Sequence, residues 1–228
     1  MAAQPYLSSR VVLPGGLFPG PAPNLATSHD ADPDQAGRPD TAYPTVVTVH
    51  PLTGHEEDWL ARSRDLPAAL LTSRLIEACV VPPPSAEGQP SLAGRLLSGD
   101  RDYLVLQIRR LTLGDAVHAV ASCPACRQEM DVDFDSSRIP LDGQPQTAPS
   151  YTVQLPAPGE SPSRLVRFRL PRGEDQEAIA HLDLDAAAAL LLTRCLLDPV
   201  GPPLTPSQVQ AVSDAMELVA PALHLELE

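Results

Sequence analysis

Two cysteines, Cys123 and Cys126, have the spacing of this chain that is most typical of metal chemistry, in the segment Cys-Pro-Ala-Cys. Two thiolates at this spacing can fill half of a tetrahedral zinc site, but a structural zinc ion needs four ligands. His118 precedes the pair and could approach as a further ligand, whereas no second Cys-x-x-Cys segment occurs. The remaining cysteines, Cys79 and Cys195, lie in apolar runs and are expected to be buried free thiols.

Three interpretations of the Cys123–Cys126 pair stay open at this point. The pair could hold zinc, it could be structural without a metal, or it could be a redox pair. A redox Cys-x-x-Cys normally lies at the start of a helix that follows a strand. Strands rather than such a helix are expected around this pair, so zinc remains the cofactor to consider, and its presence stays unknown.

Catalytic motifs are absent from the sequence. His55-Glu56-Glu57 departs from the His-Glu-x-x-His pattern of zinc peptidases, and no glycine-rich phosphate loop or nucleophile elbow occurs. Asp131, Asp133 and Asp135 alternate with apolar residues, which is typical of a solvated strand face and not of a calcium loop. The sequence therefore indicates a protein that is not an enzyme.

The elements next to the cysteines are the most regular of the chain. A helix is predicted over residues 100–113, because Leu104, Ile108 and Leu111 recur on one stripe, and Gly114 ends it. Two alternating strands, residues 116–122 and 129–135, then form a hairpin with one apolar face. Three arginines are predicted to lie off the helix stripe and to contact partner proteins: Arg101, Arg109 and Arg110. Local pairing with Asp100, Asp102 and Asp115 is the equally weighted alternative.

Helix-capping patterns place further helices. Thr53 and Glu56 form a capping box before a helix through Trp59, and a second helix is expected over residues 66–80. Residues 151–155 and 165–170 look like another hairpin, followed by helices over 173–182 and 185–198. Thr205, Pro206 and Gln208 open a last helix, after which ALHLELE alternates like a strand.

The fold class expected from this order is α+β, with helices packed on short antiparallel β-hairpins. We divide the chain into a flexible Pro/Gly-rich arm over residues 1–44, a helical half with the CPAC hairpin over 45–140, and a second half over 141–228. Leu17 and Phe18 would be the apolar anchors of the arm. A faint internal repeat, IEACVVPP against LTRCLLDP, is consistent with pseudo-duplicated halves, and chance similarity between Leu-rich helices explains it equally well.

The composition of the chain limits the classes of partner that it can bind. The 228 residues carry a net charge of -13, and all 16 basic residues are Arg. Such an acidic chain is a poor ligand for nucleic acid, because binding phosphates requires clustered cations. No apolar run is long enough to span a bilayer, and the first residues do not read as a signal peptide. We therefore expect a protein made in the cytoplasm whose partners are other proteins.

Several segments together resemble a known family. They are VxPLTGHEEDWL (49–60), LLTSRLIEACV (70–80), LLSGDRDYLVLQIRRLTLGD (96–115), the CPAC hairpin, FRLPRGEDQEA (168–178) and AALLLTRCL (188–196). This series is similar to the T4-type phage baseplate hub family of contractile phages and phage-tail-like injection systems. The resemblance implies a second Cys-pair hairpin after the last helix, but the sequence ends at LHLELE, which leaves a four-cysteine site incomplete.

What the resemblance implies about function is a role in assembly. The first expectation is a structural subunit of the baseplate of a contractile injection machine, with other baseplate, tube or tape-measure proteins as partners. It would be made in the producing cell and built into the particle. The second is a dissociable assembly chaperone for the tube or tape-measure proteins.

Overall fold

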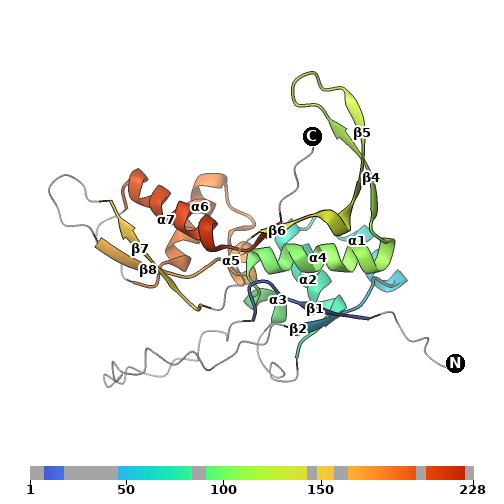
Figure 1. Cartoon of the computed structure of the whole chain (residues 1–228), viewed down its shortest axis with the longest axis horizontal. Coiled ribbons are helices and arrows are strands. Elements are labelled where there is room, and N and C mark those ends of the chain that lie inside the picture. Colours follow the sequence, from blue (N-terminus) through green and yellow to red (C-terminus); the bar gives the residue numbers. More distant parts are fainter. Residues whose placement is uncertain are drawn as a thin grey trace.

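The fold is α+β, as expected, with helices packed against short antiparallel strand pairs (Figure 1). The computed structural model describes residues 8–17, 46–83, 91–142, 148–156, 164–198 and 204–223. In Figure 1 the described elements form two lobes side by side, with one long hairpin standing out from the first lobe.

The first lobe combines a small sheet with four helices. Strands β1 (Ser9–Val12), β2 (Val46–Val49) and β3 (Val80–Val81) pair antiparallel in that order. The helices are α1 (Gly54–Arg62), α2 (Ala68–Cys79), α3 (Leu92–Arg95) and α4 (Ser98–Leu113). The predicted capping box is confirmed, because the Thr53 N–H donates to Glu56 Oε2 at 2.9 Å. One apolar cluster fills this lobe and includes Val49, Ile76 and Leu104.

The prediction that residues 1–44 form a flexible arm is wrong for residues 8–17. Strand β1 pairs with β2 from Ser9 opposite Val49 to Val12 opposite Val46. Val11, Leu13 and Leu17 are buried in the core of the first lobe. The prolines and glycines on either side made this short β-branched segment difficult to recognise as a strand in the sequence. In the structure, its backbone groups form hydrogen bonds with β2. Leu17 is therefore an anchor within its own chain, and Phe18 lies outside the described residues.

Helix α4 confirms the predicted stripe and its end. Leu104 and Ile108 are buried, and Leu111 packs partly against the same cluster. Gly114 adopts φ +84°, a conformation that favours glycine, and its N–H donates to the Arg110 carbonyl. The chain leaves the helix at this point and enters the hairpin.

The second lobe is built from one hairpin and three helices. Strands β7 (Tyr151–Leu155) and β8 (Arg164–Phe168) pair antiparallel, as predicted. They are followed by α5 (Gly173–Ile179), α6 (Leu184–Cys195) and α7 (Pro206–Val219), and α7 begins at the predicted Thr205 cap. Strand β9 (Ala222–Leu223), near the end of the second lobe, pairs antiparallel with β6 (Leu141–Asp142), which follows the long hairpin of the first lobe. Small apolar clusters around Phe168 and Val166 form the core of this lobe.

Both lobes contain a strand followed by two helices, β2–α1–α2 in the first and β8–α5–α6 in the second. In the first, the His50 N–H just after β2 donates to the carbonyl of Cys79 at the end of α2, at 2.8 Å. In the second, the Arg169 N–H just after β8 donates to the carbonyl of Cys195 at the end of α6, at 2.9 Å. The next residues also correspond, since Val49 pairs with Val80 and Phe168 forms a bridge with Leu196. These matches favour pseudo-duplicated halves over chance similarity.

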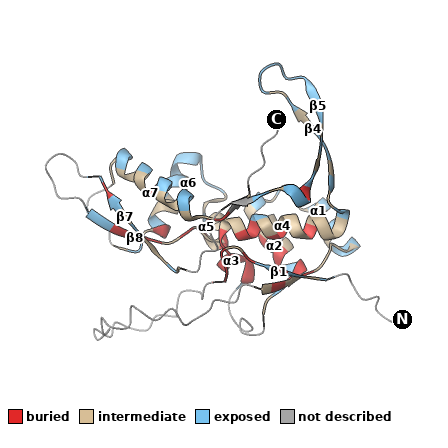
Figure 2. Cartoon of the chain, in the orientation of Figure 1, coloured by how far each residue is buried: buried red, intermediate tan, exposed pale blue. Residues whose placement is uncertain are grey.

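The long hairpin consists of β4 (Ala116–Ser122) and β5 (Glu129–Asp135), as predicted. Its alternation is also confirmed, because Val117 lies opposite Phe134 and Ala121 opposite Met130. The apolar face of the hairpin is only partly covered by the rest of the chain, since Met130 is 46% exposed and Ala119 is exposed. Figure 2 shows that the hairpin is largely exposed over its length.

Candidate interaction surfaces

Arg101 does not lie on the surface, so its predicted placement on the exposed face of α4 is wrong. The side chain is fully buried and donates to Ser73 Oγ and Ala93 O, both at 2.9 Å, and to Ala69 O at 2.7 Å. Burial lowers the pKa of this guanidinium, and nearby carboxylates, Glu177 first, oppose the shift. Arg101 therefore joins α2, α3 and α4 from inside, where no partner protein reaches it.

The sequence did contain the signal for this burial. Arg101 precedes Leu104 by three residues and Ile108 by seven, which places all three on one face of the helix. Charge alone favoured an exposed position, because arginine is rarely fully buried without partners. The partners are two backbone carbonyls and a hydroxyl, which a sequence pattern does not reveal.

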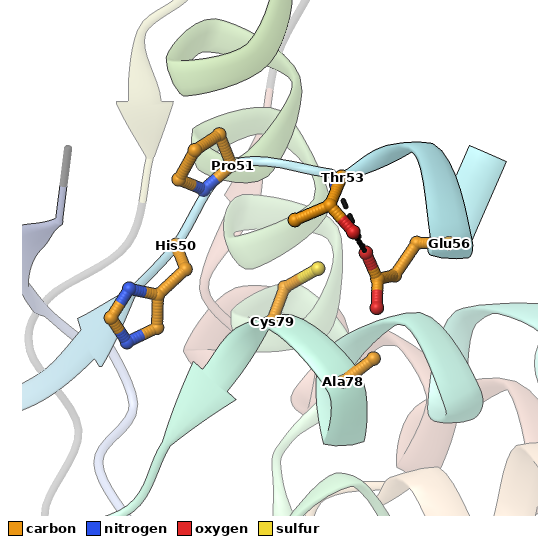
Figure 3. A pocket seen from close by; sticks show the side chains of 6 residues that line it. All are labelled: His50, Pro51, Thr53, Glu56, Ala78 and Cys79. Carbon is orange, nitrogen blue, oxygen red and sulfur yellow. Dashed lines mark hydrogen bonds between the residues drawn. The ribbon is translucent and has the colours of Figure 1, made fainter. Parts of the chain in front are cut away.

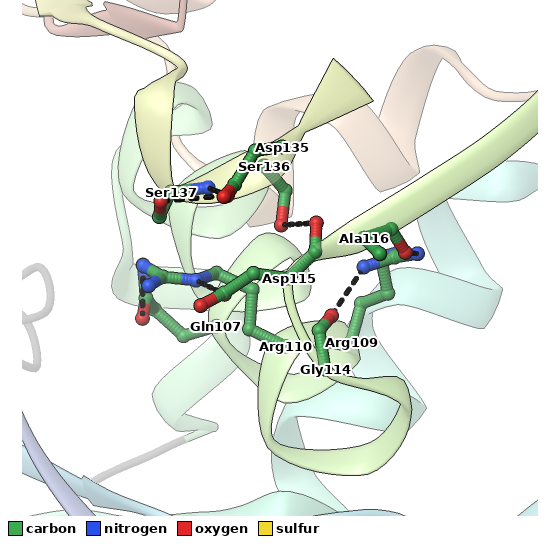
Figure 4. A network of polar contacts seen from close by, with 9 residues as sticks. All are labelled: Gln107, Arg109, Arg110, Gly114, Asp115, Ala116, Asp135, Ser136 and Ser137. Carbon is green, nitrogen blue, oxygen red and sulfur yellow. Dashed lines mark hydrogen bonds and ion pairs between the residues drawn. The ribbon is translucent and has the colours of Figure 1, made fainter. Parts of the chain in front are cut away.

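Arg109 and Arg110 lie half-buried where α4 meets the hairpin (Figure 4). Arg109 donates to Gly114 O at 2.6 Å and to Ala116 O at 2.7 Å, while Arg110 Nε meets Asp115 Oδ1 at 2.5 Å. The hydrogen bond with Asp115 raises the pKa of Arg110. Ser136 adds two hydrogen bonds to the Asp115 carbonyl. The local pairing expected for Arg110 with Asp115 is present, and both arginines brace the base of the hairpin.

Asp100 is the acidic neighbour of Arg101 and is equally buried. It accepts a hydrogen bond from the Gly15 N–H at 2.8 Å, while its Oδ2 has no hydrogen-bond partner in the described part of the chain. Burial raises the pKa of this carboxyl to about 7, against the opposing hydrogen bond from Gly15. Asp100 thus ties the first turn of α4 to the loop after β1, and it does not pair with a surface arginine.

Asp175 at the start of α5 forms a second buried charged centre, which was not predicted from the sequence. Arg169 reaches it with two nitrogens at 2.6 and 2.9 Å, Arg194 with Nε at 2.7 Å, and the Arg172 N–H at 2.9 Å. Burial would raise the pKa of Asp175, but these hydrogen bonds outweigh it and lower the pKa. A signal existed, since Asp175 follows the N-cap of α5 by three residues, as Glu56 follows Thr53.

A small pocket of about 290 Å³ lies between the end of β2 and the end of α2 (Figure 3). It is lined by His50, Pro51, Thr53, Glu56, Ala78 and Cys79. Glu56 is held by its hydrogen bonds with Thr53, which lower its pKa. Burial raises the pKa of the Cys79 thiol to about 11, so this sulfur is protonated at neutral pH and is a poor nucleophile. The side chains that line this pocket therefore contribute to the stability of the fold.

The two cysteines of the CPAC segment lie at the free end of the hairpin. Cys123 is half-exposed and Cys126 exposed, and neither forms a disulfide. The N–H groups of Cys126 and Ala125 hydrogen-bond to the Cys123 sulfur and lower its pKa. Arg127 adopts φ 60°, so the chain turns back immediately after the second cysteine. The two cysteines of the predicted pair therefore lie close together at the tip of the hairpin.

His118 is not brought to the cysteines. Its Nδ1 lies 2.7 Å from Asp133 Oδ1, directly across the two strands and away from the tip. Cys79 and Cys195 are buried in the first and second lobes, as predicted. Across the described ranges no group of three or more metal-ligating side chains is present. The structure thus brings two thiols together at the tip of the hairpin, without a third metal-ligating side chain among the described residues.

Comparison with known families gives a match over most of the first lobe, the hairpin and much of the second lobe. The model of the family described as "T4 bacteriophage base plate protein" matches residues 39–196, more than half of the 228-residue chain. The chain belongs to this family. The resemblance read from the sequence is therefore confirmed for a T4-type baseplate protein. No curated protein sequence and no solved structure matches it.

Membership of the T4 baseplate family points to a structural rather than a catalytic protein. It also implies that the natural partners are other proteins of a phage particle. None of the helices described here is both long enough and apolar enough to cross a membrane. The matched range contains the hairpin, Arg109 and Arg110, and ends one residue after α6.

Proposed function

We propose that this chain is a structural subunit of the baseplate of a contractile, phage-tail-like injection machine, made in the cytoplasm of the producing cell and retained in the assembled particle. The observation that carries the proposal is the family match over residues 39–196. A projecting hairpin with an uncovered apolar face suits a protein that is completed by neighbours, because exposed apolar patches commonly mark interaction sites.

The contact surface that we propose includes the junction of α4 and the hairpin, with Arg109 and Arg110. Both side chains are half-buried, and their visible roles are local hydrogen bonds. A guanidinium has five donors, so each arginine keeps donors for a partner beyond those local bonds. The partners proposed are other baseplate, tube or tape-measure proteins.

The experiment is deletion of the gene, followed by electron microscopy and mass spectrometry of the purified particles. We expect particles to be absent or truncated without the protein, and wild-type particles to contain it. Normal contractile particles formed without the protein would overturn an assembly role. Truncated particles in the deletion strain, together with absence of the protein from wild-type particles, would instead identify the dissociable chaperone.

A pair of variants tests the arginine surface. If Arg110 acts only through Asp115, then Arg110→Ala and Asp115→Ala should reduce incorporation into particles equally. If Arg110 also contacts a partner, Arg110→Ala should reduce incorporation further. Arg64→Ala, at an exposed position in the turn after α1, is the control, and incorporation of this variant should match the wild type.

A further inference from the structure

The two faces of the β4–β5 hairpin differ sharply in chemistry. Residues directly opposite each other share a face, so one face combines Val117 with Phe134, Ala119 with Val132, and Ala121 with Met130. The other face carries four carboxylates along one strand: Glu129, Asp131, Asp133 and Asp135. The apolar face is half-buried to exposed, so this chain leaves it largely uncovered along the hairpin.

The apolar face leads directly to the cysteine pair. The ladder continues one step beyond Ser122, because the Cys123 N–H donates to the Gln128 carbonyl at 2.8 Å. Side chains alternate along a strand, which places Cys123 on the same face as Ala121 and Ala119. The Arg127 N–H donates to the Cys123 carbonyl at 2.8 Å, and this tight turn holds Cys126 beside Cys123 at the end of this face.

We propose that two copies of this chain pair through their β4–β5 hairpins, apolar face against apolar face, and that the two cysteine pairs at the tips together bind one zinc ion. Each copy supplies Cys123 and Cys126. The four thiols lose their protons to solvent on binding, and the zinc is held by four thiolates in a closed tetrahedral site.

We take a second copy of the chain as the partner, because it both covers the apolar face and completes the set of four zinc ligands. A two-fold interface is isologous, so the same patch serves on both subunits, and a patch that contains two ligands yields four. The same arrangement turns the four carboxylates of each hairpin outward to water, where their mutual repulsion is screened. The N–H groups that bond to the Cys123 sulfur orient it before the metal binds.

Metal binding and association are coupled in this arrangement. Two thiolates alone form an incomplete zinc site, and one hairpin face is small beside the standard protein interface of about 800 Å² per partner. Zinc should therefore promote pairing, and pairing should promote zinc binding, as linkage requires. The inference is independent of the proposed function, since it concerns only the isolated chain.

The test uses the purified full-length protein with zinc, dialysed to remove excess metal, at roughly 0.15 M salt. Elemental analysis and light scattering should give about one zinc ion per two chains and a dimer. A chelator should release the zinc and return a monomer. Far-UV circular dichroism should hardly change, because the hairpin stands outside both cores.

Two variants separate the metal from the surface. Cys123→Ser with Cys126→Ser should abolish zinc binding and weaken the dimer by roughly tenfold or more. Met130→Thr with Val132→Thr keeps the strand propensity but makes the apolar face polar, and it should weaken both zinc binding and pairing. The matched control is Val120→Thr, the same change on the acidic face, where Val120 lies opposite Asp131. This control should pair and bind zinc as the wild type does.

Three results would each overturn the proposal. The first is a monomer that binds no zinc. The second is one zinc per chain in a monomer, and the third is a dimer that the double cysteine variant leaves intact. Circular dichroism of every variant verifies that the two lobes remain folded, so a misfolded protein is not mistaken for loss of pairing.

Discussion

Asp100 shows how a single buried carboxyl links the stability of this fold to pH. Its pKa is raised to about 7 from an ordinary value of 3.8, because burial penalises the charged form. A carboxyl whose folded pKa is raised stabilises the fold fully below its unfolded pKa. That contribution is lost as pH rises through the folded value, so Asp100 should make the protein less stable at pH 8 than at pH 4.

Replacing Asp100 with Asn should remove this pH dependence. The amide oxygen can still accept from the Gly15 N–H, but no charge is buried at high pH. We expect Asp100→Asn to gain on the order of 2–4 kcal/mol over wild type at pH 8, and little at pH 4. Urea unfolding at both pH values measures the difference. Asp58→Asn, at an exposed pair with Arg62, is the control and should show no comparable gain. A gain that is equal at both pH values would contradict the assignment.

Arg101 provides the opposite case, a buried cation that the fold requires. Removing its side chain leaves Ser73 Oγ, Ala69 O and Ala93 O without this donor. We expect Arg101→Ala to lower the free energy of unfolding by about 3–5 kcal/mol, in the range for loss of a buried charged partner. Chemical denaturation measures this loss, with Arg109→Ala at the half-exposed end of α4 as the milder comparison. Unchanged stability in Arg101→Ala would restore Arg101 as a candidate for partner binding.

At the scale of elements, the pairing of strand β1 has a testable consequence for the stability of the fold. It is one of the two edge strands of the first sheet, and Leu13, which follows it and is 1% exposed, belongs to the main apolar cluster. The unfolding midpoint measures how far the fold depends on this segment. Deleting residues 1–17 should lower it strongly, because Val47 and Val49 lose apolar cover and β2 loses one of its two strand partners.

Limited proteolysis gives an independent measurement of β1. Residues 9–17 should stay attached to the protected core after cleavage elsewhere, through strand pairing and the bridge between Leu17 and Leu96. Leu13→Ala, just after β1, should cost about 2–4 kcal/mol, and Val12→Ala, at the 63% exposed last position of β1, much less. Equal costs at the two positions would show that β1 is not part of the core.

Sequence patterns predicted the elements that carry their own local signals. The Thr53–Glu56 and Thr205–Gln208 caps, the Leu104–Ile108 stripe and the alternating hairpin strands all depend on neighbours within a few residues. Strand β1 and the burial of Arg101 depend on contacts far along the chain, with β2 and with Ala69, Ser73 and Ala93. The cysteine pair was found for the same local reason, whereas the exposure of the apolar face required the tertiary structure.

At the scale of the whole molecule, the two lobes meet where backbone approaches backbone. A side chain at Gly99 would place its Cβ 1.8 Å from the Pro221 carbonyl oxygen, which is too close for any residue but glycine. At Gly173 the Cβ would lie 2.1 Å from the Ala93 oxygen and 2.2 Å from an Arg101 nitrogen. The Gly173 N–H also donates to the Leu96 carbonyl at 2.9 Å. The start of α5 in the second lobe therefore packs against α3 of the first lobe.

Adding a single methyl group at these positions tests whether the lobes depend on each other. Gly99→Ala and Gly173→Ala should each cost about 1–3 kcal/mol or more, because backbone atoms must move apart to admit the Cβ. Gly54→Ala is the matched control, since nothing lies within 4 Å of a Cβ there and alanine is the better helix former. If the lobes fold as one unit, thermal unfolding of both variants should remain a single transition at lower temperature. Two separate transitions, or costs no larger than that of Gly54→Ala, would show that the contact at Gly99 and Gly173 does not couple the lobes.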